Sequence, residues 1–83
     1  EPRGMPWRVV EHAEQRWNVS IAAERRPNAE AWCLVLSFRA ATDPRQSLWI
    51  SYPLESHSKG MLFAQAERIP DESLTALLAE RLG

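Results

Sequence analysis

The sequence contains few of the residues on which several common classes of small protein depend. Its 83 residues include one cysteine, Cys33, which excludes an internal disulfide and a multi-cysteine zinc site. The two histidines, His12 and His57, lie too far apart in the sequence to act as paired local metal ligands. We therefore expect no metal and no cofactor. So low a cysteine content is typical of a reducing compartment, which predicts a cytoplasmic protein; a cysteine-poor secreted protein is the alternative.

Long apolar runs and an excess of charge of one sign are also missing. No apolar run approaches the roughly 18 residues of a membrane-spanning helix, so no membrane partner is expected. Ten Lys and Arg residues against eleven Asp and Glu residues give a net charge of -1, and Lys59 is the single lysine. No strong electrostatic field therefore draws the chain to nucleic acid or to a membrane surface.

The length predicts one small domain spanning residues 1–83. A domain of this size buries roughly 60–65% of the surface of its unfolded chain. Its stability is therefore expected to be marginal unless a second copy or a partner protein covers more of it. We expect residues 1–5 to be disordered or to derive from an expression tag.

Four segments have the composition or the alternation of β-strands. They are Trp7–His12, Trp17–Ala23, Trp32–Arg39 and Leu48–Tyr52. Turn-forming residues, including Pro27 and Pro44, lie in the connections between them. Because short connections join neighbouring strands, an antiparallel β-meander is expected.

The C-terminal segment Pro70–Leu82 has the spacing of an amphipathic helix, with Leu74, Leu77, Leu78 and Leu82 on one stripe. We therefore predict an α+β fold: a four-stranded antiparallel β-meander with this C-terminal helix packed on one face. The predicted core comprises Trp17, Val19, Ile21, Trp32, Leu34, Leu36, Phe38, Leu48, Ile50, Leu74, Leu77, Leu78 and Leu82.

Residues 53–69 are expected to be irregular or to form a short helix. The stretch Ser56–Gly60 has the composition of a loop. After it, helical spacing links Leu62, Ala66 and Ile69, and Ser58 is a suitable N-cap residue.

Candidate catalytic residues are scarce. Cys33 lies in an apolar strand segment, where burial favours the inert thiol over the reactive thiolate. His57 lies in the polar loop Ser56–Gly60, a plausible place for acid–base chemistry or for an anion, but the loop lacks the glycine spacing of a phosphate-binding loop. We interpret Cys33 as a packing residue and the loop as solvated surface, so no catalytic residue is predicted.

The sheet face opposite the predicted helix has an unusual composition. Alternation assigns to it Arg8, Val10, His12, Asn18, Ser20, Ala22, Cys33, Val35, Ser37, Arg39, Trp49 and Ser51. Small and apolar residues mixed with Trp and Arg are more typical of a protein interface than of open surface. The predicted interface residues are Trp49 as apolar anchor, Arg8 and Arg39 as register-fixing donors, and Val10 and Val35.

These observations predict a small non-catalytic protein–protein interaction module or accessory subunit that self-associates through this face. The strand Trp7–His12 is a second candidate contact, as an exposed edge that recruits a partner strand. The alternative function is binding of single-stranded nucleic acid, with bases stacked on Trp and phosphates held by Arg. A β-meander followed by a helix is also the outline of some dimeric proteins of that class, but the near-zero net charge disfavours it.

Overall fold

Four strands and two helices make up the protein in a computed structural model that describes residues 6–25, 27–43 and 45–82. In chain order they are β1 (Arg8–His12), β2 (Gln15–Glu24), β3 (Trp32–Ala40), β4 (Ser47–Ser56), α1 (Lys59–Ala66) and α2 (Asp71–Leu82). The strands form one antiparallel sheet in the order β1-β2-β3-β4. The predicted α+β class and β-meander are confirmed. The expectation for residues 1–5 falls outside the described residues.

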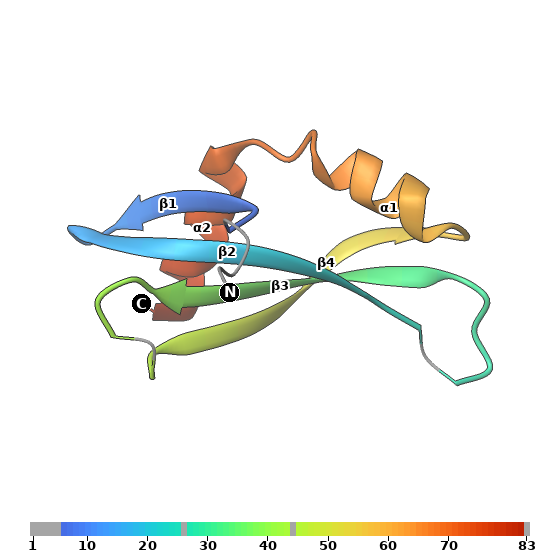
Figure 1. Ribbon diagram of the computed structural model, residues 1–83, viewed down its shortest axis with the longest axis horizontal. Coiled ribbons are helices and arrows are strands. Elements are labelled where there is room, and N and C mark those ends of the chain that lie inside the picture. Colours follow the sequence, from blue (N-terminus) through green and yellow to red (C-terminus); the bar gives the residue numbers. More distant parts are fainter. Residues whose placement is uncertain (1–5, 26, 44, 83) are drawn as a thin grey trace, which may run out of the picture.

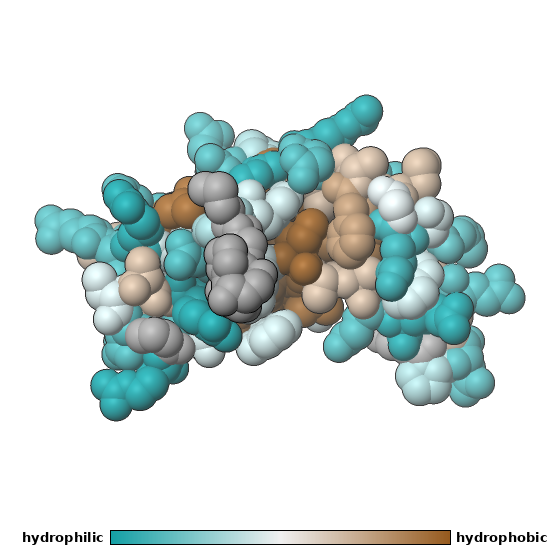
Figure 2. All heavy atoms as spheres, viewed as in Figure 1, coloured by the Kyte–Doolittle hydropathy of each residue, from teal (hydrophilic) through white to brown (hydrophobic). Residues whose placement is uncertain are grey.

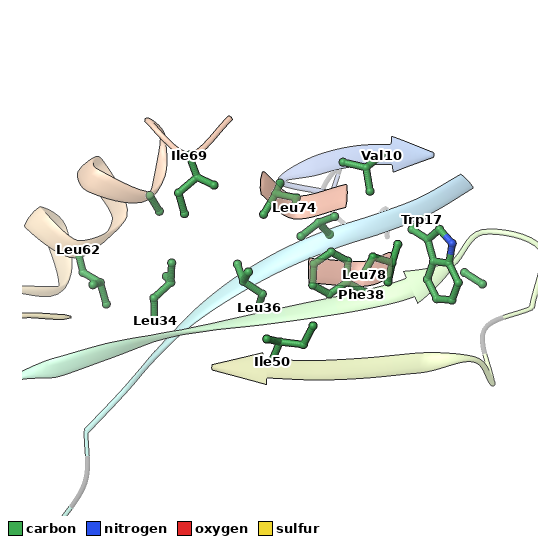
Figure 3. Packing of buried hydrophobic residues seen from close by; sticks show 13 residues of the cluster. Val10, Trp17, Leu34, Leu36, Phe38, Ile50, Leu62, Ile69, Leu74 and Leu78 are labelled. Atoms are coloured by element: carbon green, nitrogen blue, oxygen red, sulfur yellow. The ribbon is translucent and has the colours of Figure 1, made fainter. Parts of the chain in front are cut away.

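Both helices pack on the same face of the sheet, which we call the covered face (Figure 1). Helix α2 lies closest to β1, whereas α1 contacts β2, β3 and β4 at the other end of the sheet. In Figure 3, Leu62 of α1 lies near Leu34, and Leu78 of α2 lies near Phe38. Two short helices thus cover the face that one helix was predicted to cover. Neither helix is long and apolar enough to cross a membrane, and the described residues contain no other.

The core confirms most of the predicted residues and adds others. Buried residues of the cluster are Val10, Trp17, Val19, Leu34, Leu36, Phe38, Ala40, Ile50, Leu62, Ala66, Ile69, Leu74 and Leu78. Ile21, Trp32, Leu48 and Leu77 pack against it while partly exposed. The prediction for Leu82 is wrong, because this residue of the last helical turn is 46% exposed.

Within residues 53–69, for which an irregular segment or a short helix was predicted, residues 53–56 belong to β4 and Lys59–Ala66 form α1. Ser58 caps it: its Oγ accepts a hydrogen bond from the backbone N–H of Met61 at 3.2 Å. Near the start of α1, the Lys59 ammonium lies 4.8 Å from the centre of the Trp32 ring, and the Arg25 guanidinium lies 5.1 Å from it. These cation–π contacts attach α1 and the β2–β3 connection to the first residue of β3.

The tight turn between β1 and β2 decides which residues of β1 face the core. Ala13 and Glu14 have φ angles of 54° and 63°, so both central residues of this two-residue hairpin are left-handed. The turn pairs His12 with Gln15 and therefore Val10 with Trp17 on the covered face. The assignment of Arg8, Val10 and His12 to the opposite face is wrong, because the apolar pair Val9–Val10 leaves the phase of the strand ambiguous.

The side chain of Arg8 fastens β1 to the chain between the two helices. Its guanidinium donates hydrogen bonds to the carbonyl oxygens of Glu67, at 2.8 Å, and of Ile69, and it pairs with the Asp71 carboxylate at 3.0 Å. The Trp7 indole N–H donates to the Glu67 carboxylate at 2.8 Å. The end of α1 and the start of α2 are thus both held to β1.

Strand β4 continues past its predicted end at Tyr52, with an irregularity. Tyr52 pairs with Leu34 and Glu55 with Cys33, so two extra residues, Pro53 and Leu54, bulge from β4. An insertion of two residues preserves the alternation of side chains, and Leu54 therefore packs towards the core. Proline is tolerated here because β4 is an edge strand.

Replacing Glu14 with glycine should stabilise the protein, because glycine adopts a positive φ without the steric cost that glutamate bears. We expect the free energy of unfolding to rise by about 0.5–1 kcal/mol, measured by urea denaturation. The matched control Glu80→Gly, at an exposed position inside α2, should lower it by about 1 kcal/mol. Equal losses in both variants would contradict the role assigned to the turn.

Replacing Arg8 with methionine should destabilise the protein, because two carbonyl oxygens and Asp71 lose a charged donor at a side chain that is only 18% exposed. A loss of about 1–3 kcal/mol is expected by the same measurement. The exposed Arg39→Met is the control and should change stability by less than about 0.5 kcal/mol. Equal stability of the two variants would contradict the role of Arg8.

Candidate functional site: the uncovered face

The sheet face opposite the helices, here called the uncovered face, is a surface on which neither helix packs. The side chains of directly paired residues on neighbouring strands lie on the same face of the sheet. The register of the strands therefore shows which residues belong to the uncovered face. They are Val9 and Glu11 of β1; Arg16, Asn18, Ser20, Ala22 and Glu24 of β2; Cys33, Val35, Ser37 and Arg39 of β3; and Ser47, Trp49, Ser51 and Glu55 of β4. In Figure 1 the sheet lies in front of α2, and Figure 2 shows apolar groups near the middle of this view with hydrophilic groups at both ends.

Three of the five predicted interface residues lie together on the uncovered face. Trp49 is 62% exposed, the highest value among the large apolar side chains described as exposed. Arg39 is also exposed, and its partner Ser47 is two residues from Trp49. Val35 is 9% exposed although neither helix covers it, so its neighbours on the same face shelter it. These three residues form one contiguous group on β3 and β4.

The other two predicted interface residues lie elsewhere. Val10 is 4% exposed and belongs to the core, so it offers no area to a partner. The guanidinium of Arg8 already donates its hydrogen bonds to the connection between α1 and α2. On β1, Val9, which is 44% exposed, and Glu11 lie on the uncovered face instead of Arg8 and Val10. The feature that identifies Val9 and Glu11 is the two-residue turn after His12, because it fixes which residues of β1 face the helices.

The side chains beside Trp49 are small, so its indole projects from an otherwise flat surface. Ser20 and Ser37 occupy the same cross-strand row, and Ala22, Val35 and Ser51 form the next row. A flat, small-residue surface with one large aromatic side chain can accept a partner closely and anchor it at one point. The site therefore has the chemistry of a binding surface.

Charge on the uncovered face is mixed. Arg16 pairs with Glu11 at 3.7 Å across the β1–β2 hairpin. Arg39 is the remaining arginine of the face, whereas Glu24 and Glu55 add carboxylates at its far end. The uncovered face therefore presents no net positive charge to a polyanion.

Cys33 lies in a hollow that the irregularity in β4 creates. The hollow has a volume of about 550 Å³ and is lined by Glu24, Cys33 and the segment from Ser51 to Glu55. The Cys33 Sγ lies 3.5 Å from Oε2 of Glu55, which accepts a hydrogen bond from the thiol. A neighbouring carboxylate opposes formation of a thiolate, the form that attacks substrates. A concave pocket thus exists, but this thiol–carboxylate pair does not activate its nucleophile.

The loop around His57 leads from β4 into α1. His57 is exposed in the bend after β4. The Oγ of Ser58 caps α1, and the Ser58 N–H donates to the Oγ of Ser56 at 3.3 Å. Within the described part of the chain, no three His, Cys, Asp or Glu residues are grouped so as to hold a metal ion.

Replacing Glu55 with glutamine should speed alkylation of Cys33 by iodoacetamide, because the thiolate is no longer repelled by an adjacent negative charge. We expect the second-order rate at pH 7.5 to rise by about two- to tenfold, corresponding to about 0.4–1.4 kcal/mol of charge repulsion at this partly exposed site. Glu14→Gln at the opposite end of the sheet is the control and should leave the rate unchanged. A slower reaction in Glu55→Gln would contradict the assigned electrostatic effect.

Comparisons with protein-family models, with curated proteins and with solved structures find no match to this chain. A functional assignment therefore rests on the chemistry of its own surface. Of the described surfaces, the uncovered face around Trp49 has the clearest binding character.

Proposed function

We propose that this chain is a small non-catalytic interaction module, or an accessory subunit, that associates with a second copy of itself through the uncovered face. One observation carries the proposal: a four-stranded sheet has both helices on one face and a 62%-exposed tryptophan on the other. A partner that packs on Trp49 removes this indole from water, which is a favourable change.

The size of the face supports a modest rather than a permanent association. Four strands about 4.8 Å apart and up to about 10 residues long present roughly 500–600 Å² on one face. A standard interface buries about 800 Å² on each partner. The uncovered face alone is therefore expected to give a reversible complex that depends strongly on its central anchor.

Single-stranded nucleic acid is the alternative partner. Trp49 and Arg39 lie close enough on the uncovered face to serve one ligand, by stacking and by a phosphate contact. The carboxylates of Glu11, Glu24 and Glu55 on the same face oppose a polyanion. Protein association is favoured for this reason. The cytoplasmic location and the expectation that no cofactor is needed stay predictions.

Replacing Trp49 with alanine should weaken self-association by at least about tenfold, because an apolar anchor of an interface is lost. The solution mass should be measured by light scattering on a sizing column at concentrations from about 10 to 500 µM. Met61→Ala is the matched control, since Met61 is 56% exposed but lies on α1. Circular dichroism should show that both variants keep the fold. Equal assembly of the wild type and Trp49→Ala would remove Trp49 from the interface.

The nucleic-acid alternative predicts binding to mixed-sequence oligonucleotides that falls steeply with added salt and with Arg39→Ala. Fluorescence anisotropy at about 50 mM salt measures it. The protein-association proposal predicts no such binding. Tight, salt-sensitive binding by a monomeric protein would overturn the proposal in favour of the alternative.

A further inference from the structure

The backbone of β4 has a free edge whose hydrogen-bonding groups can be assigned. The Ala40 N–H donates to the Gln46 carbonyl oxygen at 3.0 Å, which sets the phase of the β3–β4 ladder. In an antiparallel pair, residues alternate between those that bond to the partner strand and those that point away. Leu48, Ile50 and Tyr52 therefore bond to β3. The N–H and C=O groups of Ser47, Trp49 and Ser51 point to the free edge.

No described segment lies beyond this part of β4. In Figure 1 the first half of β4 forms the lower border of the sheet, and α2 crosses behind the sheet without extending below this part of β4. The opposite edge, β1, has five residues, and α2 packs closest to it. Strand Trp7–His12 was the edge expected to recruit a partner; it is an edge strand, but β4 offers the longer and more open one.

The residues of the free edge are arranged symmetrically about Trp49. The sequence Ser47-Leu48-Trp49-Ile50-Ser51 has serine at both ends, a branched aliphatic residue at each inner position and no charge. An antiparallel pair of two identical strands with its two-fold axis at Trp49 sets serine against serine and leucine against isoleucine. In such a pair, residues of the same kind lie opposite each other. A foreign strand of arbitrary sequence does not give this arrangement.

We propose that a second copy of this chain pairs with β4 edge to edge, antiparallel, with the two-fold axis at Trp49. The pairing keeps the partner named in the proposed function, a second copy of this chain, and moves the contact from the flat uncovered face to the backbone of β4. Ser47 bonds to Ser51 of the partner subunit, and Trp49 bonds to the partner's Trp49. The two sheets become one continuous sheet.

Pro53 favours this register. It is in phase with Ser47, Trp49 and Ser51, so the missing N–H of the proline lies on the free edge. With the axis at Trp49, the bonding residues end before Pro53. If the two-fold axis lay at Ile50, Pro53 would lie opposite Ser47 of the partner subunit. The carbonyl oxygen of that serine would then receive no hydrogen bond, because proline has no N–H. The proline therefore disfavours pairing that extends beyond Ser51.

Edge pairing also gives Trp49 a partner. Directly opposed residues of a bonded antiparallel pair have Cα atoms about 5.5 Å apart, and cross-strand aromatic pairs are favourable contacts. The two indoles project from the same side of the joined sheet and shelter each other. The two uncovered faces then form one surface of double width.

Hydrogen exchange of the wild-type protein, followed by NMR, tests the pairing without any substitution. The amides of Ser47, Trp49 and Ser51 should exchange at least tenfold more slowly at about 500 µM than at about 20 µM. The amides of Val9 and Glu11, on the free edge of β1, are the internal control and should not change. Protection of the β1 amides alone, or of neither edge in a dimeric sample, overturns edge pairing through β4.

Two variants separate edge pairing from association through the flat face. Ser51→Pro removes an outward N–H as Pro53 already does, and so keeps the bonds between β3 and β4; Ser51→Ala is its matched control. Ala22→Glu places a charge on the uncovered face at β2, away from the edge. Edge pairing predicts a monomer for Ser51→Pro and a mass of twice 9.5 kDa for the wild type, Ser51→Ala and Ala22→Glu.

The opposite pattern, a dimeric Ser51→Pro and a monomeric Ala22→Glu, overturns edge pairing and keeps the proposed function. A wild type that is monomeric at 500 µM overturns both. If Ser51→Pro is not folded by circular dichroism, the exchange data on the wild type decide alone.

Discussion

The guanidinium of Arg8 joins three parts of the chain: the start of β1, the residues just beyond α1 and the start of α2. It binds two carbonyl oxygens just beyond α1 and the carboxylate at the start of α2, and it is carried by the first residue of β1. These bonds hold the connection between the helices against the sheet edge. Together with the apolar residues that both helices bury, these bonds hold α1 and α2 on one face of the sheet, where the apolar core forms.

The one-sided core explains the functional proposal. Helices on both faces would bury Trp49, whereas helices on one face leave it 62% exposed among small neighbours. The same arrangement leaves β4 open along Ser47–Ser51, because α2 packs closest to the opposite edge. A small domain with little interior area gains by joining another surface. Trp49 lies where the exposed face and the free edge coincide.

Much of the candidate site was predictable from the sequence because strand alternation is a local property. The faces of β2, β3 and the first half of β4 follow from it, and so does the exposure of Trp49 and Arg39. The phase of β1 was not predictable by that method, because Val9 and Val10 are both apolar and either fits the core. Ala13 and Glu14 form a left-handed turn without glycine or asparagine, so the usual sequence signal of a tight hairpin is absent.

The sequence by itself determined the α+β class, the four strands, the helix at residues 71–82 and the in-phase core of β2 and β3, because each depends on periodicity within one segment. Only the tertiary structure decided the roles of Arg8 and Val10, the cover that α1 provides, the hollow beside Cys33 and the open edge of β4. Those features depend on turn geometry, on an insertion opposite another strand and on which side of the sheet the helices lie. Periodicity says how side chains point relative to their neighbours in the chain, and packing alone decides which of the two sides becomes the interior.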